Sequence, residues 1–86
     1  MSYNVIIRTS AKKELKRLNN YIFERVMERI IELKETPRPI GCEKLGGKDS
    51  YRIRIGDFRV VFTIDEKAKL VEIIKIGDRK EVYKKR

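Results

Sequence analysis

Polar and apolar residues alternate on both sides of Gly56-Asp57, and this pattern predicts a β-hairpin. Side chains alternate faces along a strand, so the two arms present one apolar face and one polar face. The apolar face carries Tyr51, Ile53, Ile55, Phe58, Val60 and Phe62. The polar face carries Arg52, Arg54 and Arg59. A two-residue loop at Gly56-Asp57 pairs Ile55 with Phe58 and Arg54 with Arg59.

The segment before the hairpin carries the patterns of one strand and two helices. Residues 3–8 have the apolar centre of a strand, and Thr9-Ser10 is suited to cap the helix that follows. Asn19-Asn20 interrupts the helical spacing, so we expect two helices in an antiparallel hairpin. We expect the apolar residues of the second helix to lie in the core: Phe23, Val26, Met27, Ile30 and Ile31.

Proline and glycine mark the end of the second helix and the loop after it. Pro37 disfavours helical geometry in the residue before it, and a loop is expected through the glycines of residues 41–47. Residues 65–69 turn the chain into an apolar run at 70–76, which predicts a largely covered strand. Residues 77–86 hold little apolar content, and we expect a loop that ends in a short turn or a fraying end.

Together these elements predict an α+β fold in the order β-α-α-β-β-β. An N-terminal strand precedes an antiparallel two-helix hairpin, and a three-stranded antiparallel meander completes one sheet that packs on the helices. A chain of 86 residues supports one hydrophobic core, so we expect a single domain over residues 1–86.

Charge and composition narrow the partners and the chemistry. Twenty-two Lys and Arg against thirteen Asp and Glu give a net charge of +9, which favours nucleic acid, an acidic protein or an anionic surface. Histidine is absent, which removes the commonest general base and metal ligand, and we expect no metal and no other cofactor. Cys42 is the only cysteine, and we find no signal peptide or membrane span, so a cytoplasmic protein is expected.

The opposed arginines of the hairpin indicate an anion site. Like charges directly across two strands destabilise a sheet, so a fold that gathers three guanidiniums there needs compensation, and phosphate is the favoured anion. Two plainer interpretations stay open. The arginines form a solvated charge face, or the many charges belong to exposed ion-pair networks like those of proteins from hot environments.

Several segments, taken in their order along the chain, resemble the RelE/ParE toxin superfamily of toxin-antitoxin pairs, and most closely its RelE branch. They are Lys44-Leu45-Gly46-Gly47, Tyr51-Arg52-Ile53-Arg54-Ile55, Phe58-Arg59-Val60-Val61-Phe62, and Ile76-Gly77-Asp78-Arg79 followed by Glu81-Val82-Tyr83. The resemblance implies an endoribonuclease that enters the ribosomal decoding site and cleaves mRNA. It also implies a cognate antitoxin protein, which the net charge of the toxin suggests is acidic at the contact.

The resemblance also implies which residues form the site. By position, Arg59 matches an arginine that stabilises the transition state, Arg79 an arginine near the scissile phosphate, and Tyr83 a tyrosine that orients the substrate. Arg52 and Arg54 fall where relatives often carry lysine, and they complete the expected catalytic set. The lysines expected to contact RNA are Lys44, Lys48, Lys80 and Lys84.

The implied reaction is metal-free attack of a 2′-hydroxyl on its adjacent phosphate, which leaves a cyclic phosphate and a 5′-hydroxyl. Arginine stays protonated in proteins, so Arg52 and Arg54 are poorly suited to remove the hydroxyl proton. The general base stays unassigned, with Tyr83 the conspicuous candidate at a matching position. Two alternatives also stay open: a ParE-like toxin that inhibits DNA gyrase, and a degenerate toxin that only binds RNA or antitoxin.

Overall fold

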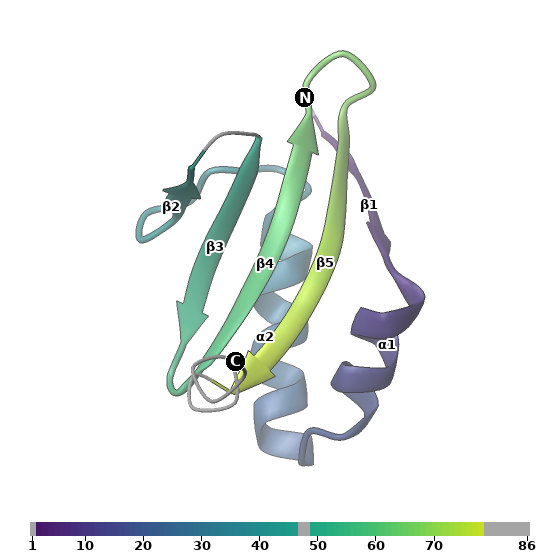
Figure 1. The fold of residues 1–86 in the computed structure, drawn as a ribbon, viewed down its shortest axis with the longest axis vertical. Coiled ribbons are helices and arrows are strands. Elements are labelled where there is room, and N and C mark those ends of the chain that lie inside the picture. Colours follow the sequence, from purple (N-terminus) through teal and green to yellow (C-terminus); the bar gives the residue numbers. More distant parts are fainter. Residues whose placement is uncertain (1, 47–48, 79–86) are drawn as a thin grey trace.

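The computed structural model describes residues 2–46 and 49–78, which form a five-stranded sheet backed by two helices (Figure 1). In chain order the elements are β1 (Asn4–Ile7), α1 (Thr9–Lys16), α2 (Asn20–Glu32), β2 (Glu43–Leu45), β3 (Ser50–Ile55), β4 (Phe58–Asp65) and β5 (Leu70–Asp78). Across the sheet the strands lie in the order β1-β5-β4-β3-β2. The C-terminal loop expected at residues 77–86 is wrong at Gly77 and Asp78, because β5 continues through both and pairs them with β4. The rest of that prediction, residues 79–86, lies outside the described residues.

The predicted α+β fold is confirmed, with a strand, two helices and then further strands of one sheet. The sheet is mixed, because β1 runs parallel to β5 while the other neighbouring strands are antiparallel. The prediction of a continuous loop before the hairpin is wrong at residues 43–45, which form β2 and pair with β3. Two of these three residues are exposed and charged, so only their pairing partner makes them a strand.

The hairpin of β3 and β4 has the predicted register. Ile55 lies opposite Phe58, and Arg54 lies opposite Arg59. Gly56 has a φ of 61°, the left-handed value that the first loop position of a type II′ turn requires and that glycine adopts without steric cost. Because the loop contains two residues, the alternation of the sequence continues unbroken from one strand into the other.

The helices contribute a narrower apolar stripe to the core than the sequence predicts. Val26 and Ile30 of α2 are buried, and Leu33 just beyond the helix is fully buried. Phe23 and Ile31, both expected in the core, are 37% and 56% exposed. Successive residues are about 100° apart around a helix, so the positions next to the buried stripe turn toward solvent.

The side chain of Asn19 caps α2. Its oxygen accepts a hydrogen bond from the backbone N–H of Ile22 at 3.0 Å. The predicted cap at Thr9-Ser10 is wrong, because both residues lie inside α1 and the residue before the helix is Arg8. Arg8 donates its own N–H to the carbonyl of Ile73 at 3.0 Å, so strand pairing continues up to the residue before the helix.

The first helix covers the part of β5 that β1 leaves open. β1 pairs with residues 70–73 only. Further along β5, the carboxylate of Glu14 accepts a hydrogen bond from the N–H of Ile76 at 2.7 Å and contacts the ammonium of Lys75 at 3.0 Å. A side chain of α1 therefore satisfies a backbone donor on the sheet edge that has no strand beside it.

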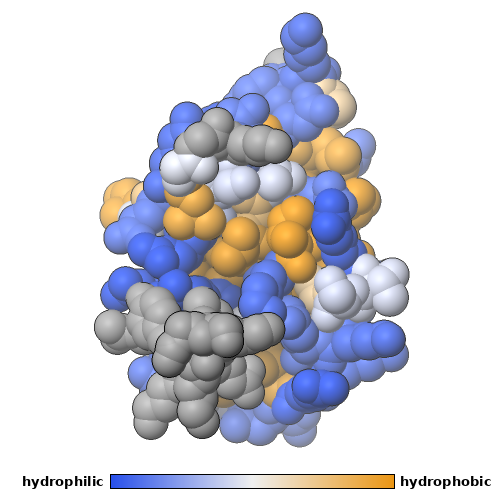
Figure 2. Space-filling model, viewed as in Figure 1, coloured by the Kyte–Doolittle hydropathy of each residue, from blue (hydrophilic) through white to orange (hydrophobic). Residues whose placement is uncertain are grey.

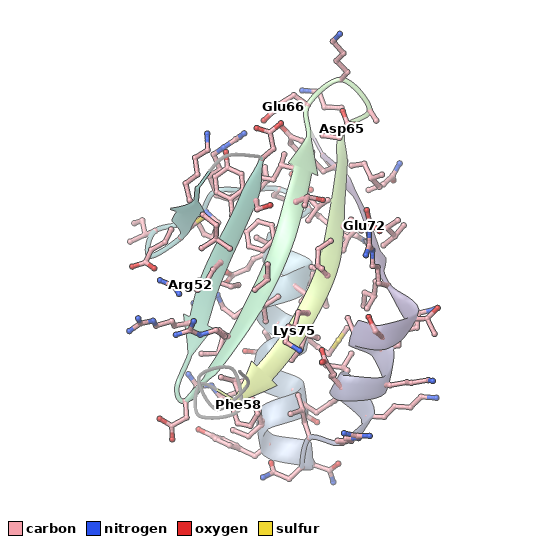
Figure 3. The ribbon with its side chains drawn as sticks, viewed as in Figure 1. Arg52, Phe58, Asp65, Glu66, Glu72 and Lys75 are labelled. Carbon is pink, nitrogen blue, oxygen red and sulfur yellow. The ribbon has the colours of Figure 1, made fainter. Side chains whose placement is uncertain are left out.

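A polar cluster joins three segments at the β4–β5 turn, where Glu66 is labelled in Figure 3. Glu66 accepts a hydrogen bond from the hydroxyl of Tyr3 at 2.7 Å and pairs with the guanidinium of Arg38 at 2.6 Å. Arg38 also donates to the hydroxyl of Tyr51 at 3.2 Å. The hydrogen bond from Tyr3, followed by that from Arg38, lowers the pKa of Glu66. The cluster ties the start of the chain, the segment after α2 and the turn together.

Candidate nucleic-acid interface

The strand register brings Arg52, Arg54 and Arg59 onto the side of the sheet that faces away from the helices; we call these three residues the arginine face. Figure 1 looks onto this side, with α2 behind the strands. Arg54 and Arg59 lie directly opposite each other, and Arg59 also lies opposite Gly77 of β5. In Figure 2, hydrophilic side chains surround a strip of apolar surface on this side.

The three guanidiniums differ in their burial. Arg54 is exposed, the side chain of Arg52 is 19% exposed, and Arg59 is 5% exposed. Arginine does not lose its proton in proteins, so burial leaves a fixed positive charge in the sheet surface. A charge with little water around it acts more strongly on a nearby anion than an exposed one. Arg59 therefore gives the face a preorganised cation at its centre.

Glu43 on β2 forms an ion pair with Arg52 directly across the strand pair. The hydrogen bond from Arg52 lowers the pKa of Glu43, followed by the charge of Arg52 and, to a smaller extent, by the charges of Arg54 and Arg59. Sequence reasoning missed this residue. The only signal that could have revealed it is the register of β2, which depends on a strand that the local pattern does not show.

Arg52 and Arg54 differ in how open they are to an anion. The Nε atom of Arg52 is buried and makes no hydrogen bond within the part of the chain that the structure describes. Arg54 forms no ion pair with any described residue. The Nε of Arg52 is closed to solvent, so the exposed guanidinium of Arg54 is the one that an anion can approach directly.

Of the other predicted site residues, the structure describes only Lys44, and it does not place Lys44 on the arginine face. Lys44 lies opposite Tyr51, whose side chain belongs to the core, so alternation directs Lys44 away from the side of Arg52. The predictions for the remaining residues lie outside the described part of the chain. These residues are Lys48, Arg79, Lys80, Tyr83 and Lys84.

Cys42 lies next to Glu43 and packs partly against the core. Burial raises the pKa of its thiol, and the neighbouring charge of Arg38 opposes that rise. A raised pKa keeps the thiol protonated and poorly nucleophilic, as expected of a small packing residue. Within residues 2–46 and 49–78, no group of three or more His, Cys, Asp and Glu could hold a metal ion. No helix in these residues is long and apolar enough to cross a membrane.

The mixed sheet, the two N-terminal helices and the arginine face define a small basic α+β protein with cations gathered on the open side of its sheet. Over residues 5–83 the chain matches the family described as "ParE toxin of type II toxin-antitoxin system, parDE". The chain belongs to this family of toxins, and its named relatives make it a RelE-like member.

Two relatives cover nearly the whole chain. The RelE1 protein of Methanocaldococcus jannaschii is 35% identical over 98% of this chain and 98% of its own length. The mRNA interferase toxin RelE of Escherichia coli is 31% identical over 96% of this chain and 92% of its own length. The predicted resemblance to the RelE branch is therefore confirmed.

Solved structures of RelE proteins are also similar to this chain. The archaeal RelE-RelB complex of Pyrococcus horikoshii contains a chain with a TM-score of 0.78 and 33% identity, over 92% of this chain and 97% of that one. The isolated RelE toxin of Escherichia coli has a TM-score of 0.81 and 26% identity, over 96% of this chain and 93% of that one.

Proposed function

We propose that this toxin is a ribosome-dependent endoribonuclease that cleaves mRNA. The observation that carries the proposal is the arginine face, where strand register holds three permanent cations together and buries one of them. A surface of this kind suits the phosphate backbone of RNA. The relative from Escherichia coli is named an mRNA interferase toxin, which supports the same activity.

The chemistry is transesterification within the RNA chain. A 2′-hydroxyl attacks the adjacent phosphorus, the bond to the 5′ oxygen breaks, and a cyclic phosphate and a 5′-hydroxyl result. Negative charge grows on the phosphate oxygens during this step, and fixed guanidiniums stabilise it without reorganising. Arg59 is proposed as the central stabiliser, with Arg52 and Arg54 beside it. Arg79 and Tyr83 stay predictions from the family pattern.

The ribosome is proposed to hold the mRNA strand in the geometry that cleavage needs. The described part of the arginine face is an open sheet surface, which has little means of bending a flexible RNA strand into line for attack. A strand already held in the decoding site reaches that geometry at lower cost, and alignment of this kind accounts for a large part of many enzymatic rates. We therefore place the action of this toxin on translating ribosomes, and hence in the cytoplasm.

An antitoxin is the proposed protein partner. The structure from Pyrococcus horikoshii is a RelE-RelB complex, which supports a RelB-type antitoxin for this chain as well. A net charge of +9 favours an acidic segment over the arginine face. Failure of a protein encoded beside this toxin to bind it with nanomolar to micromolar affinity would count against this partner.

The test is primer extension on a defined mRNA, either naked or on programmed ribosomes. Wild-type protein should cut only the ribosome-bound message, and Arg59→Ala should lower the cutting rate about 10²–10³-fold, as loss of one preorganised charge does in other enzymes. Lys67→Ala, which removes an exposed cation from the β4–β5 turn, is the matched control and should cut normally. Circular dichroism checks that both variants fold.

A second candidate, inhibition of DNA gyrase, is favoured by the ParE description of the matching family. The same fold can carry either activity. Loss of gyrase supercoiling with translation intact would support this candidate, and uncut mRNA on ribosomes with no effect on gyrase would indicate a degenerate toxin.

A further inference from the structure

The arginine face stabilises negative charge but offers no proton acceptor of its own. Guanidiniums only donate hydrogen bonds, so Arg52, Arg54 and Arg59 cannot remove a proton from an attacking hydroxyl. The β2 strand places a carboxylate directly beside them, because Glu43 pairs in register with Arg52. Residues at directly paired positions share a face of the sheet, so this carboxylate lies on the same side as the arginines.

We propose that Glu43 accepts the proton of the attacking 2′-hydroxyl, with Arg52 holding its carboxylate in place. This inference rests on the proposed RNA cleavage. The side chain of Glu43 is 54% exposed, so a ribose bound over the face can reach it. The ion pair restricts the rotamers of a long side chain, which fixes the position of a base before the substrate binds.

Electrostatics keep this carboxylate in the accepting form. The groups that face Glu43 are Arg52 and Arg54 on β3, Arg59 on β4, and the neighbouring thiol of Cys42. The arginines hold the pKa of Glu43 below its usual range, so the group is ionised at every pH at which ribosomes function. A bound phosphate diverts part of their positive field, which makes the carboxylate more basic when RNA is present.

The proposed step is balanced. A carboxylate oxygen of Glu43 takes the 2′-hydroxyl proton while the 2′ oxygen forms its bond to phosphorus. The bond from phosphorus to the 5′ oxygen breaks, and the electron pair leaves with that oxygen, which takes a proton from water. Glu43 then releases its proton to solvent. The products are a 2′,3′-cyclic phosphate and a 5′-hydroxyl.

The test measures single-turnover cleavage of ribosome-bound mRNA from pH 6 to pH 8.5. The wild-type rate should stay level across this range, because an ionised carboxylate gains nothing from higher pH. Glu43→Gln keeps the size of the side chain but removes its basicity, and should cut about 10²–10⁴-fold more slowly. Its residual rate should rise about tenfold per pH unit, because hydroxide then takes the proton.

Glu72→Gln is the matched control. Glu72 lies on the same side of the sheet and forms an ion pair with Arg8 at 2.8 Å, but on β5 and away from the arginine face. Figure 3 labels Glu72 and Arg52 on different strands. This variant should keep the wild-type rate and the level pH profile. A loss shared by both variants would overturn the inference.

Three further results separate a base from a structural ion pair. Normal cleavage by Glu43→Gln overturns the inference. Slower cleavage by this variant with a level pH profile also overturns it, because the loss of a structural contact lowers the rate without changing which group accepts the proton. A wild-type rate that climbs tenfold per pH unit also overturns it, because another group then accepts the proton, while the proposed function stands. Absence of any wild-type cut on ribosomes overturns the proposed function itself.

Discussion

The carboxylate of Glu14 in α1 accepts a hydrogen bond from the backbone N–H of Ile76 in β5, at 2.7 Å. The two residues are far apart in the chain, and the contact lies where β1 no longer covers the edge of β5. A helix side chain thus takes over the role of a neighbouring strand. Lys75, labelled in Figure 3, contacts the second carboxylate oxygen at 3.0 Å and holds the group in place.

Removing this carboxylate should destabilise the fold. Glu14→Ala leaves the N–H of Ile76 without its acceptor, and the loss of a partner for a part-buried donor costs about 1–3 kcal/mol. Urea unfolding followed by circular dichroism measures the change. Glu28→Ala is the control, because Glu28 is an exposed glutamate within α2. Equal stability of the two variants would contradict the role given to Glu14.

The repulsion between Arg54 and Arg59, which lie opposite each other, should lower the stability of the fold. Arg54→Gln removes one of two like charges across the hairpin, and we expect the free energy of unfolding to rise by about 0.2–1 kcal/mol at low salt. The gain should shrink as salt increases, because Arg54 is exposed to screening. Thermal melts at two ionic strengths test this. The same variant should cleave mRNA more slowly, and a fall in stability at low salt would refute the argument.

Two adjacent isoleucines on α2 test the boundary of the core. Ile30 is 3% exposed, while Ile31 is 56% exposed. Ile30→Ala should cost about 2–5 kcal/mol, because it leaves a cavity between the helix and the sheet. Ile31→Ala should cost well under 1 kcal/mol. Chemical denaturation of both variants measures the difference, and similar losses would show that the two side chains share the core.

The Glu66 cluster should make stability depend on acid pH. The pKa of Glu66 is lowered in the folded protein from its ordinary 4.5, mainly by the hydrogen bond from Tyr3 and then by that from Arg38. A lowered pKa stabilises the folded state fully above pH 4.5, and this contribution is lost as the pH falls through the folded-state value. Glu66→Gln should therefore be less stable than wild type near neutral pH.

The difference between wild type and Glu66→Gln should narrow steadily as the pH falls below 4.5. Denaturant midpoints measured across the acid range follow this convergence. Glu24→Gln, which changes an exposed glutamate of α2, serves as the comparison. If the difference in stability between wild type and Glu66→Gln stayed constant over the whole acid range, the charge of Glu66 would contribute nothing to stability through its hydrogen bonds.

The hairpin shows which features local pattern can predict. Alternation at residues 50–63 and a glycine at the turn determine which side chains share a face, because both depend on geometry over two residues. The pairing of Arg54 with Arg59 was therefore predictable, and so was their placement away from the core. The expected catalytic role of these arginines stays a prediction until cleavage is measured.

Helix boundaries and core membership were predicted less well. Apolar residues at helical spacing indicate that one side of α2 is buried in the core. The angle at which the helix lies on the sheet decides how wide that buried stripe is. Phe23 and Ile31 fall outside that stripe. In the same way, Thr9-Ser10 resembles a cap, but pairing of β1 with β5 extends to Arg8 and places both residues inside the helix.

Neighbouring residues along the chain are enough to predict the order of every element except β2, the register of the hairpin and the gathering of three arginines on one side of the sheet. The tertiary structure decided how deeply each arginine is buried and which carboxylate lies among them. Glu43 and Arg52 meet only because a three-residue edge strand pairs with β3. Pairing of that kind depends on a partner elsewhere in the fold, and no local pattern of polar and apolar residues encodes it.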